Sequence, residues 1–434
     1  MNYTRNTTVG LKALTLRLAL ALLLAFSCVV AKPVLACADV RAGDKVAGQP
    51  VGEGHTHVPD APDIDADYAA LCTRDGTILW ERNGHEKVPM ASTTKIMTAI
   101  VALDNSSPDT PMFVTNGAVS LEGSSASLQV GDTLPLKDLI TCMMVPSGND
   151  AAVAIAENVA GTEFAFKDMM NAKAAELGMT DTHFSNASGV VDEDNYSTAV
   201  DYLKLTREAM SYDLFREAVC QPSATVKVSG REETYESTNQ LLSEMDGVNG
   251  VKTGFTDEAG YCLVASAQRN GFEFYAVVFH SSDENQRFDD AQVLLEWGFA
   301  HFKPVTLING ATPVGDLACI SWIDKTVPVA AESAVAVNIF DYNGPITQEV
   351  TLTEKEGTIS RGEVVGSIVW TQNQEVIAQV SLVATLDVPA PGFWEGVGIW
   401  WKRLFGGFSG KPKHAVSTTM LPDTFDLVIA NVNN

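Results

Sequence analysis

The order of predicted strands and helices between residues 68 and 303 restricts the fold more than any other feature of this sequence. Two short apolar runs, Tyr68–Cys72 and Thr77–Glu81, flank an Arg-Asp-Gly turn and predict a β-hairpin. Helical patterns then predominate as far as Met210, and three further strands and a final helix follow. This order predicts an α+β domain over residues 68–303, in which helical layers cover an antiparallel sheet.

The individual elements follow from hydrophobic periodicity and from capping and turn residues. Predicted helices cover residues 92–103, 134–144, 151–160, 164–177, 199–210 and 289–299. Predicted strands cover residues 248–254, 261–268 and 272–279. Together with the first hairpin, these elements supply the sheet and the helical layers of the expected domain.

The sequence changes character after residue 303. Residues 304–388 are rich in Val, Thr and Gly in short alternating stretches, which predicts a small all-β domain. Aromatic and aliphatic residues then recur at helical spacing over 391–408, where Trp400 and Trp401 are adjacent. That pattern predicts an amphipathic helix that binds a membrane surface; a helix docked on the β domain is the alternative. We expect residues 409–434 to be a disordered tail.

Residues 1–38 have the parts of a secretory signal peptide. Basic residues precede the apolar run Leu18–Val30, and the small residues Ala36-Cys37-Ala38 follow it. We therefore expect export, to the outer face of the cytoplasmic membrane or elsewhere in the cell envelope. Cleavage at an Ala-x-Ala site and lipidation of Cys37 are both open. The polar stretch 39–67, with its Gly, Pro and Asp residues, is expected to be an exposed linker.

Composition excludes two classes of function. The formal net charge of −25 disfavours a nucleic-acid partner, because phosphate binding requires a basic surface. The seven cysteines and seven histidines are dispersed and lack the spacing of metal ligands, so we expect no metal site.

The first chemical motif is Ser92-Thr93-Thr94-Lys95, the only Ser-x-x-Lys in the chain, at the start of a predicted helix. Residues i and i+3 share one helix face, so the Ser92 hydroxyl and the Lys95 amine are expected to be neighbours. The helix N-terminus favours the negative charge that develops on an attacking serine. Lys95 is a suitable base if its pKa is lowered, as a nearby cation would do. An N-capping serine beside a surface lysine is the alternative.

The second motif is Ser147-Gly148-Asn149, which follows Pro146 and lies between two predicted helices. Ser147 is suited to relaying a proton, and Asn149 to holding a substrate amide. The same Ser-x-Asn pattern occurs at Ser237-Thr238-Asn239, so the spacing alone is unspecific, and context favours the first copy. A cluster of helix-capping residues is the alternative.

The third motif is Lys252-Thr253-Gly254, the only Lys-Thr-Gly in the chain, at the end of a predicted strand. Gly254 lets the backbone approach a ligand closely. Lys252 supplies a cation, and Thr253 supplies a hydroxyl for a carboxylate. An ordinary strand end with a turn glycine is the alternative.

In this order and at these separations, the three motifs are typical of penicillin-binding proteins and β-lactamases. Their surroundings extend the match. The segments that resemble the low-molecular-mass D-alanyl-D-alanine carboxypeptidases of serine peptidase family S11 are Pro89–Lys95, Ser147–Ala152, Phe184–Gly189, Tyr196–Asp201 and Gly250–Thr256. The resemblance covers residues 68–302, and the β domain and terminal helix also suit the longer members of the family. It implies the penicillin-binding or β-lactamase-like transpeptidase fold.

The resemblance also implies a role for each motif. Ser92 would attack the D-Ala–D-Ala bond of peptidoglycan stem peptides and form an acyl-enzyme, with Lys95 taking the proton. The backbone N–H groups of Ser92 and Phe255 would form an oxyanion hole. β-Lactam antibiotics would inhibit the enzyme, and water would release the product without a cofactor. The implied substrate-binding residues are Lys252, Thr253, Gly254, Phe255 and Arg287.

Two positions depart from the family pattern: Gly148 replaces a larger residue, and Asn195 stands where the family usually has His. A class A β-lactamase is disfavoured, because no Glu-x-x-Leu-Asn segment lies between Ser147 and Lys252. An inactive envelope-binding module is disfavoured because every motif residue is present. A D,D-endopeptidase or transpeptidase shares the nucleophile and stays open.

Overall fold

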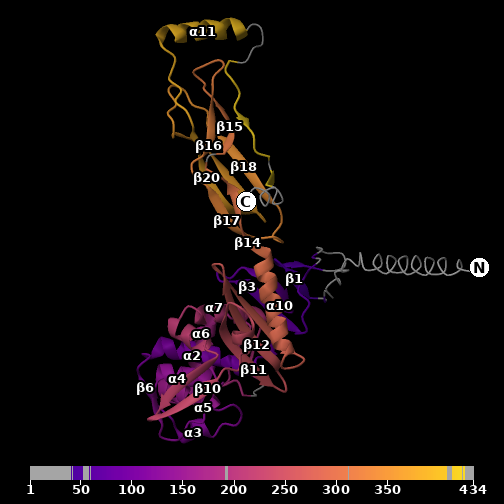
Figure 1. Cartoon of the computed structure of the whole chain (residues 1–434), viewed down its shortest axis with the longest axis vertical. Helices are drawn as coiled ribbons and strands as arrows, with labels where there is room; N and C mark the ends of the chain where they lie inside the picture. The colour runs from indigo at the N-terminus through magenta and orange to yellow at the C-terminus, as the bar shows by residue number, and fades with distance from the viewer. Residues whose placement is uncertain are drawn as a thin grey trace, which may run out of the picture.

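The protein is an elongated molecule with two domains and a helix at the far end of the second domain (Figure 1). The structure, a computed structural model, describes residues 41, 43–51, 58, 60–190, 194–310, 312–407, 413–422 and 424–425. The expected signal peptide, residues 1–38, and Cys37 lie outside the described residues.

A seven-stranded antiparallel sheet forms the centre of the first domain. The hairpin and the three later strands predicted from the sequence are all present, and β13 joins them by pairing with β3. In spatial order the strands are β11 (Val248–Thr256), β12 (Gly260–Arg269), β13 (Phe272–Ser281), β3 (Tyr68–Thr73), β4 (Ile78–Arg82), β1 (Asp44–Val46) and β2 (Gln49–Pro50). Within the described residues β11 is an edge strand, so one of its sides has no strand partner there.

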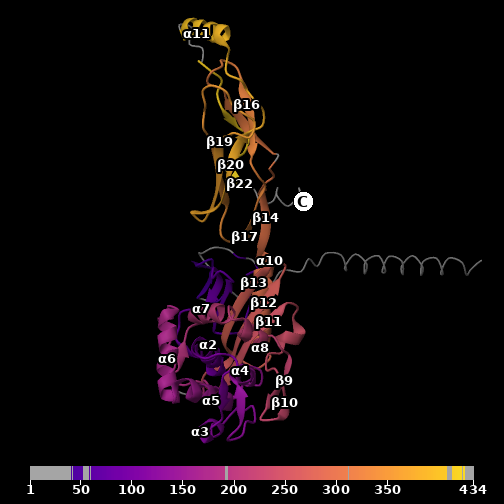
Figure 2. The same cartoon turned by 90° about the vertical axis from the view of Figure 1, so that its left-hand side faces the viewer.

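Helices cover both faces of this sheet, as the α+β prediction required (Figure 2). One face packs against α10 (Gln286–His301), and the other faces a helical layer built around α2 (Lys95–Asn105). The rest of that layer consists of α4 (Leu136–Met144), α5 (Asn149–Ala160), α6 (Glu163–Glu176), α7 (Ala199–Ala209) and α8 (Asp213–Val219). The helix α8 and the hairpin of β9 (Ser223–Val228) and β10 (Arg231–Glu236) were not among the elements predicted from the sequence.

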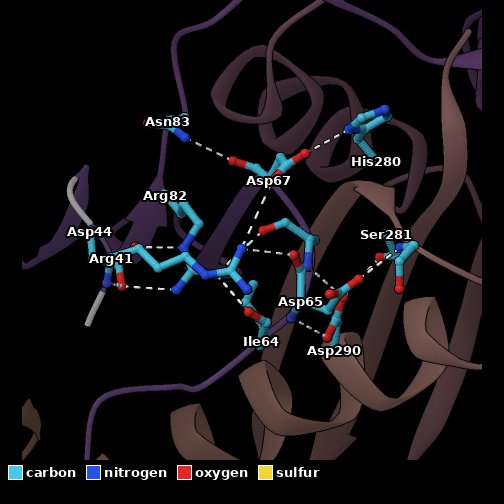
Figure 3. A network of polar contacts seen from close by, with 12 residues as sticks. Arg41, Asp44, Ile64, Asp65, Asp67, Arg82, Asn83, His280, Ser281 and Asp290 are labelled. Atoms are coloured by element: carbon cyan, nitrogen blue, oxygen red, sulfur yellow. Dashed lines mark hydrogen bonds and ion pairs between the residues drawn. The ribbon is translucent and has the colours of Figure 1, made fainter. Parts of the chain in front are cut away.

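The stretch 39–67 was expected to be an exposed linker, and this prediction is wrong for the part that the structure describes. Asp44 lies in β1 and accepts hydrogen bonds from the buried Arg82 side chain at 2.6 and 2.9 Å (Figure 3). Asp290 of α10 accepts hydrogen bonds from the backbone N–H groups of Asp65 and Ala66, at 2.8 and 2.9 Å. Asp44 and the backbone of Asp65 and Ala66 are therefore internal partners of buried charges.

The second domain is all-β, as predicted. Its larger sheet contains β15 (Pro313–Ala318), β16 (Thr326–Ala331), β20 (Glu375–Ala384), β19 (Val364–Gln372) and β18 (Ile346–Leu352), and β14 (Phe302–Ile308) pairs separately with β17 (Val335–Phe340). The expectation of a disordered tail is wrong for its described residues. Thr418–Thr419 (β21) and Thr424–Phe425 (β22) pair with β15 and β18 at the two edges of the larger sheet.

Aromatic and charged side chains join the two domains at the end of α10. His301 lies between carboxylates of both domains: its Nε2 is 2.7 Å from Asp60, and its Nδ1 is 3.5 Å from Asp341. Trp297 stacks on Tyr342, whose hydroxyl also donates to Asp60. These contacts connect the second domain to the first beyond the covalent chain.

The helix α11 (Phe393–Gly407) lies across the far end of the second domain (Figure 1). Its aromatic side chains are exposed, with Trp394 80% exposed and Phe405 62% exposed. Arg403 donates to the backbone carbonyls of Ile320 and Trp322 in the β domain. Among the described residues, no helix is long and apolar enough to cross a membrane.

Candidate active site

Ser92 lies in a single 3₁₀ turn, η1 (Ala91–Thr94), that leads directly into α2. Its neighbour Ala91 has a φ of 46°, a conformation that residues with a Cβ rarely adopt. Such strain persists only where surrounding contacts hold it, and it is concentrated at functional sites. The turn therefore presents Ser92 at the N-terminal end of a helix, where the unpaired N–H groups lie.

Lys95 is completely buried and contacts three oxygen atoms. Its Nζ lies 2.8 Å from Ser92 Oγ, 2.7 Å from Asn149 Oδ1 and 2.7 Å from the Ser188 carbonyl oxygen. Helical spacing explains the first contact, as the sequence predicted. The structure thus brings Asn149 of the second motif to the Ser-x-x-Lys motif.

The environment of Lys95 lowers its pKa well below that of a free lysine. Burial is the main cause, and the positive charge of Lys252 adds to it, while Asp150 opposes both. A neutral amine has two N–H bonds and one lone pair. Because the Asn149 and Ser188 oxygens can only accept, they would take the two N–H bonds of the neutral form, and its lone pair would face the Ser92 hydroxyl.

The loop that contains Ser147, called the Ser147 loop below, is held in place by the buried carboxylate of Asp150. Ser147 itself has a φ of 66° and is almost fully buried. Asp150, at the start of α5, accepts hydrogen bonds from the N–H groups of Ala126 and Leu128 at 2.9 and 3.1 Å. Asn149 in turn donates through Nδ2 to the Glu122 carbonyl at 2.8 Å, which leaves its Oδ1 directed at Lys95.

Gly148, where the sequence departs from the family pattern, occupies a position with no space for a side chain. A Cβ atom there would lie 2.7 Å from Asp150 Oδ1 and 2.8 Å from the Cys142 carbonyl oxygen. Real Cβ atoms essentially never approach other heavy atoms so closely. The glycine is therefore required by the way this loop packs on α4.

The loop that supplies the Ser188 carbonyl is a functional element that the sequence analysis did not assign. The Asn186 side chain shapes it by accepting hydrogen bonds from the N–H groups of Ser188 and Gly189, at 3.1 and 2.6 Å. Asn195, the second departure, is buried and donates to Thr94 Oγ1 at 3.0 Å, so it ties the nucleophile turn to this region. The Asn-x-x-Gly spacing is the sequence signal for such a side-chain-capped turn.

Substitution of Gly189 tests directly how this loop packs against the nucleophile turn. Its φ is 79°, and a Cβ atom would overlap the Ala91 carbonyl oxygen. We expect Gly189→Ala to lower the free energy of unfolding in urea by about 3 kcal/mol or more, from backbone strain plus overpacking, and to slow acylation of Ser92. Gly178 is the matched control because its φ is 69° and nothing surrounds its Cβ position. Gly178→Ala should lower the free energy of unfolding by about 1 kcal/mol. Equal losses of this free energy in the two variants would contradict the close packing of Gly189 on the Ala91 carbonyl oxygen.

The Lys-Thr-Gly motif lies in β11 beside the nucleophile turn. Lys252 is 1% exposed, and its Nζ donates to the Thr253 carbonyl oxygen at 2.9 Å. Burial, aided by the nearby charge of Arg287, lowers the pKa of Lys252 to about 7. A Cβ atom on Gly254 would lie 3.0 Å from the Met90 carbonyl oxygen and 3.1 Å from the Ser92 nitrogen. The absence of a side chain at Gly254 thus lets the strand approach the backbone of Ser92.

Arg287, from α10, completes the positive end of the site. Its Nη1 donates to the Gly254 carbonyl oxygen at 3.3 Å, and its Nη2 pairs with Glu284 at 3.0 Å. The Nε atom is buried and has no partner among the described residues. Phe255 follows Gly254, is 47% exposed and packs on Tyr261. The cations and backbone groups gathered here suit an anionic ligand with a carbonyl group.

Comparison with known proteins identifies the family of this chain. The model of the D-alanyl-D-alanine carboxypeptidases, peptidase S11, matches residues 55–283, and that of the C-terminal domain of penicillin-binding protein 5 matches residues 302–390. The chain belongs to peptidase family S11. It is therefore a serine-type D-alanyl-D-alanine carboxypeptidase, of a family that forms acyl-enzymes and binds penicillin.

Individual relatives of this S11 peptidase match between 55% and 76% of the chain. The D-alanyl-D-alanine carboxypeptidase DacF of Bacillus subtilis is 30% identical, covering 76% of this chain and 87% of its own. The crystal structure of DacD from Francisella tularensis superposes with a TM-score of 0.57 at 27% identity, over 76% and 96% of the two chains. The DD-transpeptidase of Streptomyces gives a TM-score of 0.53 at 34% identity, over 55% and 98%. The predicted fold class is confirmed.

The S11 site gathers residues from all three predicted motifs. Ser92, Lys95 and Asn149 are linked by hydrogen bonds, and Lys252 is near enough to affect the pKa of Lys95. Among the described residues, no cluster of three or more His, Cys, Asp or Glu side chains is placed to hold a metal ion.

Proposed function

We propose that Ser92 is the nucleophile and Lys95 the general base in the removal of the terminal D-alanine from peptidoglycan stem peptides. The observation that carries this assignment is the set of three contacts around Lys95 Nζ. Two acceptors fix the N–H bonds of the neutral amine, so its lone pair is directed at the Ser92 hydroxyl. Attack by Oγ on the penultimate carbonyl carbon transfers the hydroxyl proton to Lys95.

The negative charge of the tetrahedral intermediate is stabilised by the backbone N–H groups of Ser92 and Phe255. The close approach of Gly254 to the Ser92 nitrogen supports this pairing. Lys252, Thr253 and Arg287 bind the substrate carboxylate at the positive end of the site.

The intermediate then collapses with cleavage of the D-Ala–D-Ala amide bond. Ser147 relays the proton from Lys95 to the departing amine of D-alanine, and Asn149 holds Lys95 and the substrate amide. The acyl group remains as an ester on Ser92. Water, deprotonated by Lys95, cleaves this ester, and Ser92 recovers its proton.

Two assays on the unmodified protein test this function. We expect one penicilloyl group on Ser92 in intact-mass spectra after incubation with benzylpenicillin, and release of D-alanine from a D-Ala–D-Ala peptide. An adduct without release would favour a transpeptidase, which an added amine acceptor would reveal. Release of peptide from a cross-linked dimer would favour an endopeptidase, and rapid loss of the adduct would favour a β-lactamase.

The pKa values of the two lysines predict a bell-shaped pH dependence for kcat/KM. On the acidic side, kcat/KM should rise with pH as Lys95 loses its proton and becomes a base. On the alkaline side, Lys252 in the free enzyme loses its charge above about pH 7, so carboxylate binding weakens and KM rises. An acyl-D-alanine thioester without a terminal carboxylate is the control, and its alkaline decline should be absent. A decline of equal size on both substrates would contradict this role of Lys252.

We also propose that α11 attaches the protein to the outer face of the cytoplasmic membrane. The helix carries exposed aromatic side chains and is fixed to the β domain by Arg403. Its position at the far end of the β domain is consistent with attachment there. Export is required for this location, and we propose that residues 1–38 direct it.

Substitution tests the attachment better than truncation, because β21 and β22 follow α11 and belong to the β domain. A variant with Trp394→Ser, Trp400→Ser and Phe405→Ser should bind phosphatidylglycerol-containing vesicles about a hundredfold more weakly and keep its D-alanine release. The control replaces three exposed apolar residues elsewhere, Phe113, Phe164 and Val376, by Ser. Equal vesicle binding by the two variants in co-sedimentation would contradict the proposal.

A further inference from the structure

The second Ser-x-Asn sequence, Ser237-Thr238-Asn239, lies at the active site although it does not form the second motif. Two backbone hydrogen bonds hold it: the Ser237 N–H donates to the Pro222 carbonyl at 2.8 Å, and the Thr238 N–H donates to the Val145 carbonyl at 3.2 Å. Val145 precedes the Ser147 loop by two residues. The segment therefore lies between that loop and the Lys-Thr-Gly strand.

The side chain of Thr238 meets that strand directly. Its Oγ1 is 2.6 Å from Thr253 Oγ1, which is the hydroxyl assigned above to the substrate carboxylate. Within the part of the chain that the structure describes, neither hydroxyl has another hydrogen-bond partner. Thr253 is 4% exposed, so few directions are open to its proton.

Hydroxyl chemistry fixes the direction of this hydrogen bond once substrate is bound. Each threonine hydroxyl carries one proton and can also accept. A carboxylate can only accept, so Thr253 must give its single proton to the substrate. The bond between the two threonines then has one remaining direction, from Thr238 to Thr253.

We propose that Thr238 is a positioning residue for the terminal carboxylate of the substrate: it donates to Thr253 Oγ1 and directs the Thr253 proton at that carboxylate. The inference rests on the proposed function, since it presupposes that Thr253 binds the carboxylate. Donation from Thr238 also polarises the Thr253 hydroxyl and strengthens its bond to the anion. Thr238 thereby favours substrates that end in a free carboxylate, and it does not act on the Ser92 and Lys95 pair.

The test compares Thr238→Val, which keeps the shape and removes the hydroxyl, with Thr238→Ser, which keeps the hydroxyl. On a D-Ala–D-Ala peptide, Thr238→Val should raise KM between about three- and tenfold, the loss of one net hydrogen bond, with kcat within about twofold of the unmodified protein. Thr238→Ser should restore KM. On an acyl-D-alanine thioester without a terminal carboxylate, kcat/KM of Thr238→Val should be unchanged.

Three results would overturn the inference: an unchanged KM in Thr238→Val, an equal loss on both substrates, or failure of Thr238→Ser to restore KM. Equal loss on both substrates would mean that the hydroxyl supports the loop itself, and thermal unfolding of the variant would show the same defect. Failure of the proposed function gives a different result, because the unmodified protein would then release no D-alanine from the peptide.

Discussion

Replacement of Ser92 by alanine should abolish both D-alanine release and penicillin binding. The expected fall in kcat is about four orders of magnitude or more, because among the described residues no other hydroxyl is paired with the Lys95 amine and only binding and the oxyanion hole remain. Intact-mass spectra after incubation with benzylpenicillin should show the unmodified mass alone. Steady-state release of D-alanine measures the residual rate.

Ser120 provides the control for this substitution. It is exposed, and within the described part of the chain its hydroxyl donates to the Asn116 carbonyl alone, so Ser120→Ala should keep full activity. Far-ultraviolet circular dichroism and thermal unfolding should be unchanged in Ser92→Ala, since the Ser92 side chain is only partly buried. A penicilloyl adduct on the Ser92→Ala protein would refute the assignment of the nucleophile.

Replacement of Lys95 by arginine keeps a positive charge at this position, but it should reduce activity almost as much as Ser92→Ala does. A guanidinium stays protonated at all accessible pH values, so it cannot take the proton of Ser92. We expect acylation by benzylpenicillin to slow by about 10³-fold or more at pH 8, the usual scale for loss of a general base. Stopped-time mass spectrometry of adduct formation measures this rate.

The charge-conserving control is Lys137→Arg, on an exposed lysine that pairs with Asp109. Its acylation rate should equal that of the unmodified protein. Because arginine is larger than lysine and position 95 is fully buried, Lys95→Met supplies a second variant that fills the site without overpacking. Rapid acylation of either Lys95 variant would show that another group accepts the proton.

The residues of this site that could be predicted from the sequence are those expected to act through their side chains. Helical spacing was sufficient to predict the contact between Ser92 and Lys95, because positions i and i+3 share a face in any helix. The contact between Ser188 and Lys95 could not be predicted in this way, because Ser188 contributes a backbone carbonyl and every residue possesses one. The motif that contains Thr238 was recognised in the sequence, but the role of Thr238 was not predicted. Its contact with Thr253 depends on tertiary packing, which the motif does not indicate.

The two incorrect predictions about the fold have separate physical causes. The described part of 39–67 is polar, and polarity was interpreted as exposure, yet Asp44 is nearly inaccessible because Arg82 requires a buried counter-ion. The described tail residues form strands of only two residues each, and two residues are too few for hydrophobic alternation to be recognised. By contrast, the long periodic segments of the catalytic domain were predicted within a few residues of their ends.

If α11 attaches to the membrane as proposed above, its placement would limit where in the cell wall this protein can act. The strands of the second domain run along the long axis of the molecule, and ten-residue β20 alone spans roughly 33 Å at 3.3 Å per residue. A stalk of that length, joined to the catalytic domain through His301 and Trp297, separates the catalytic domain from α11. Under the attachment proposed above, the enzyme would reach stem peptides only within a thin layer at that distance from the membrane, so the length of the β domain would set the depth at which they are trimmed.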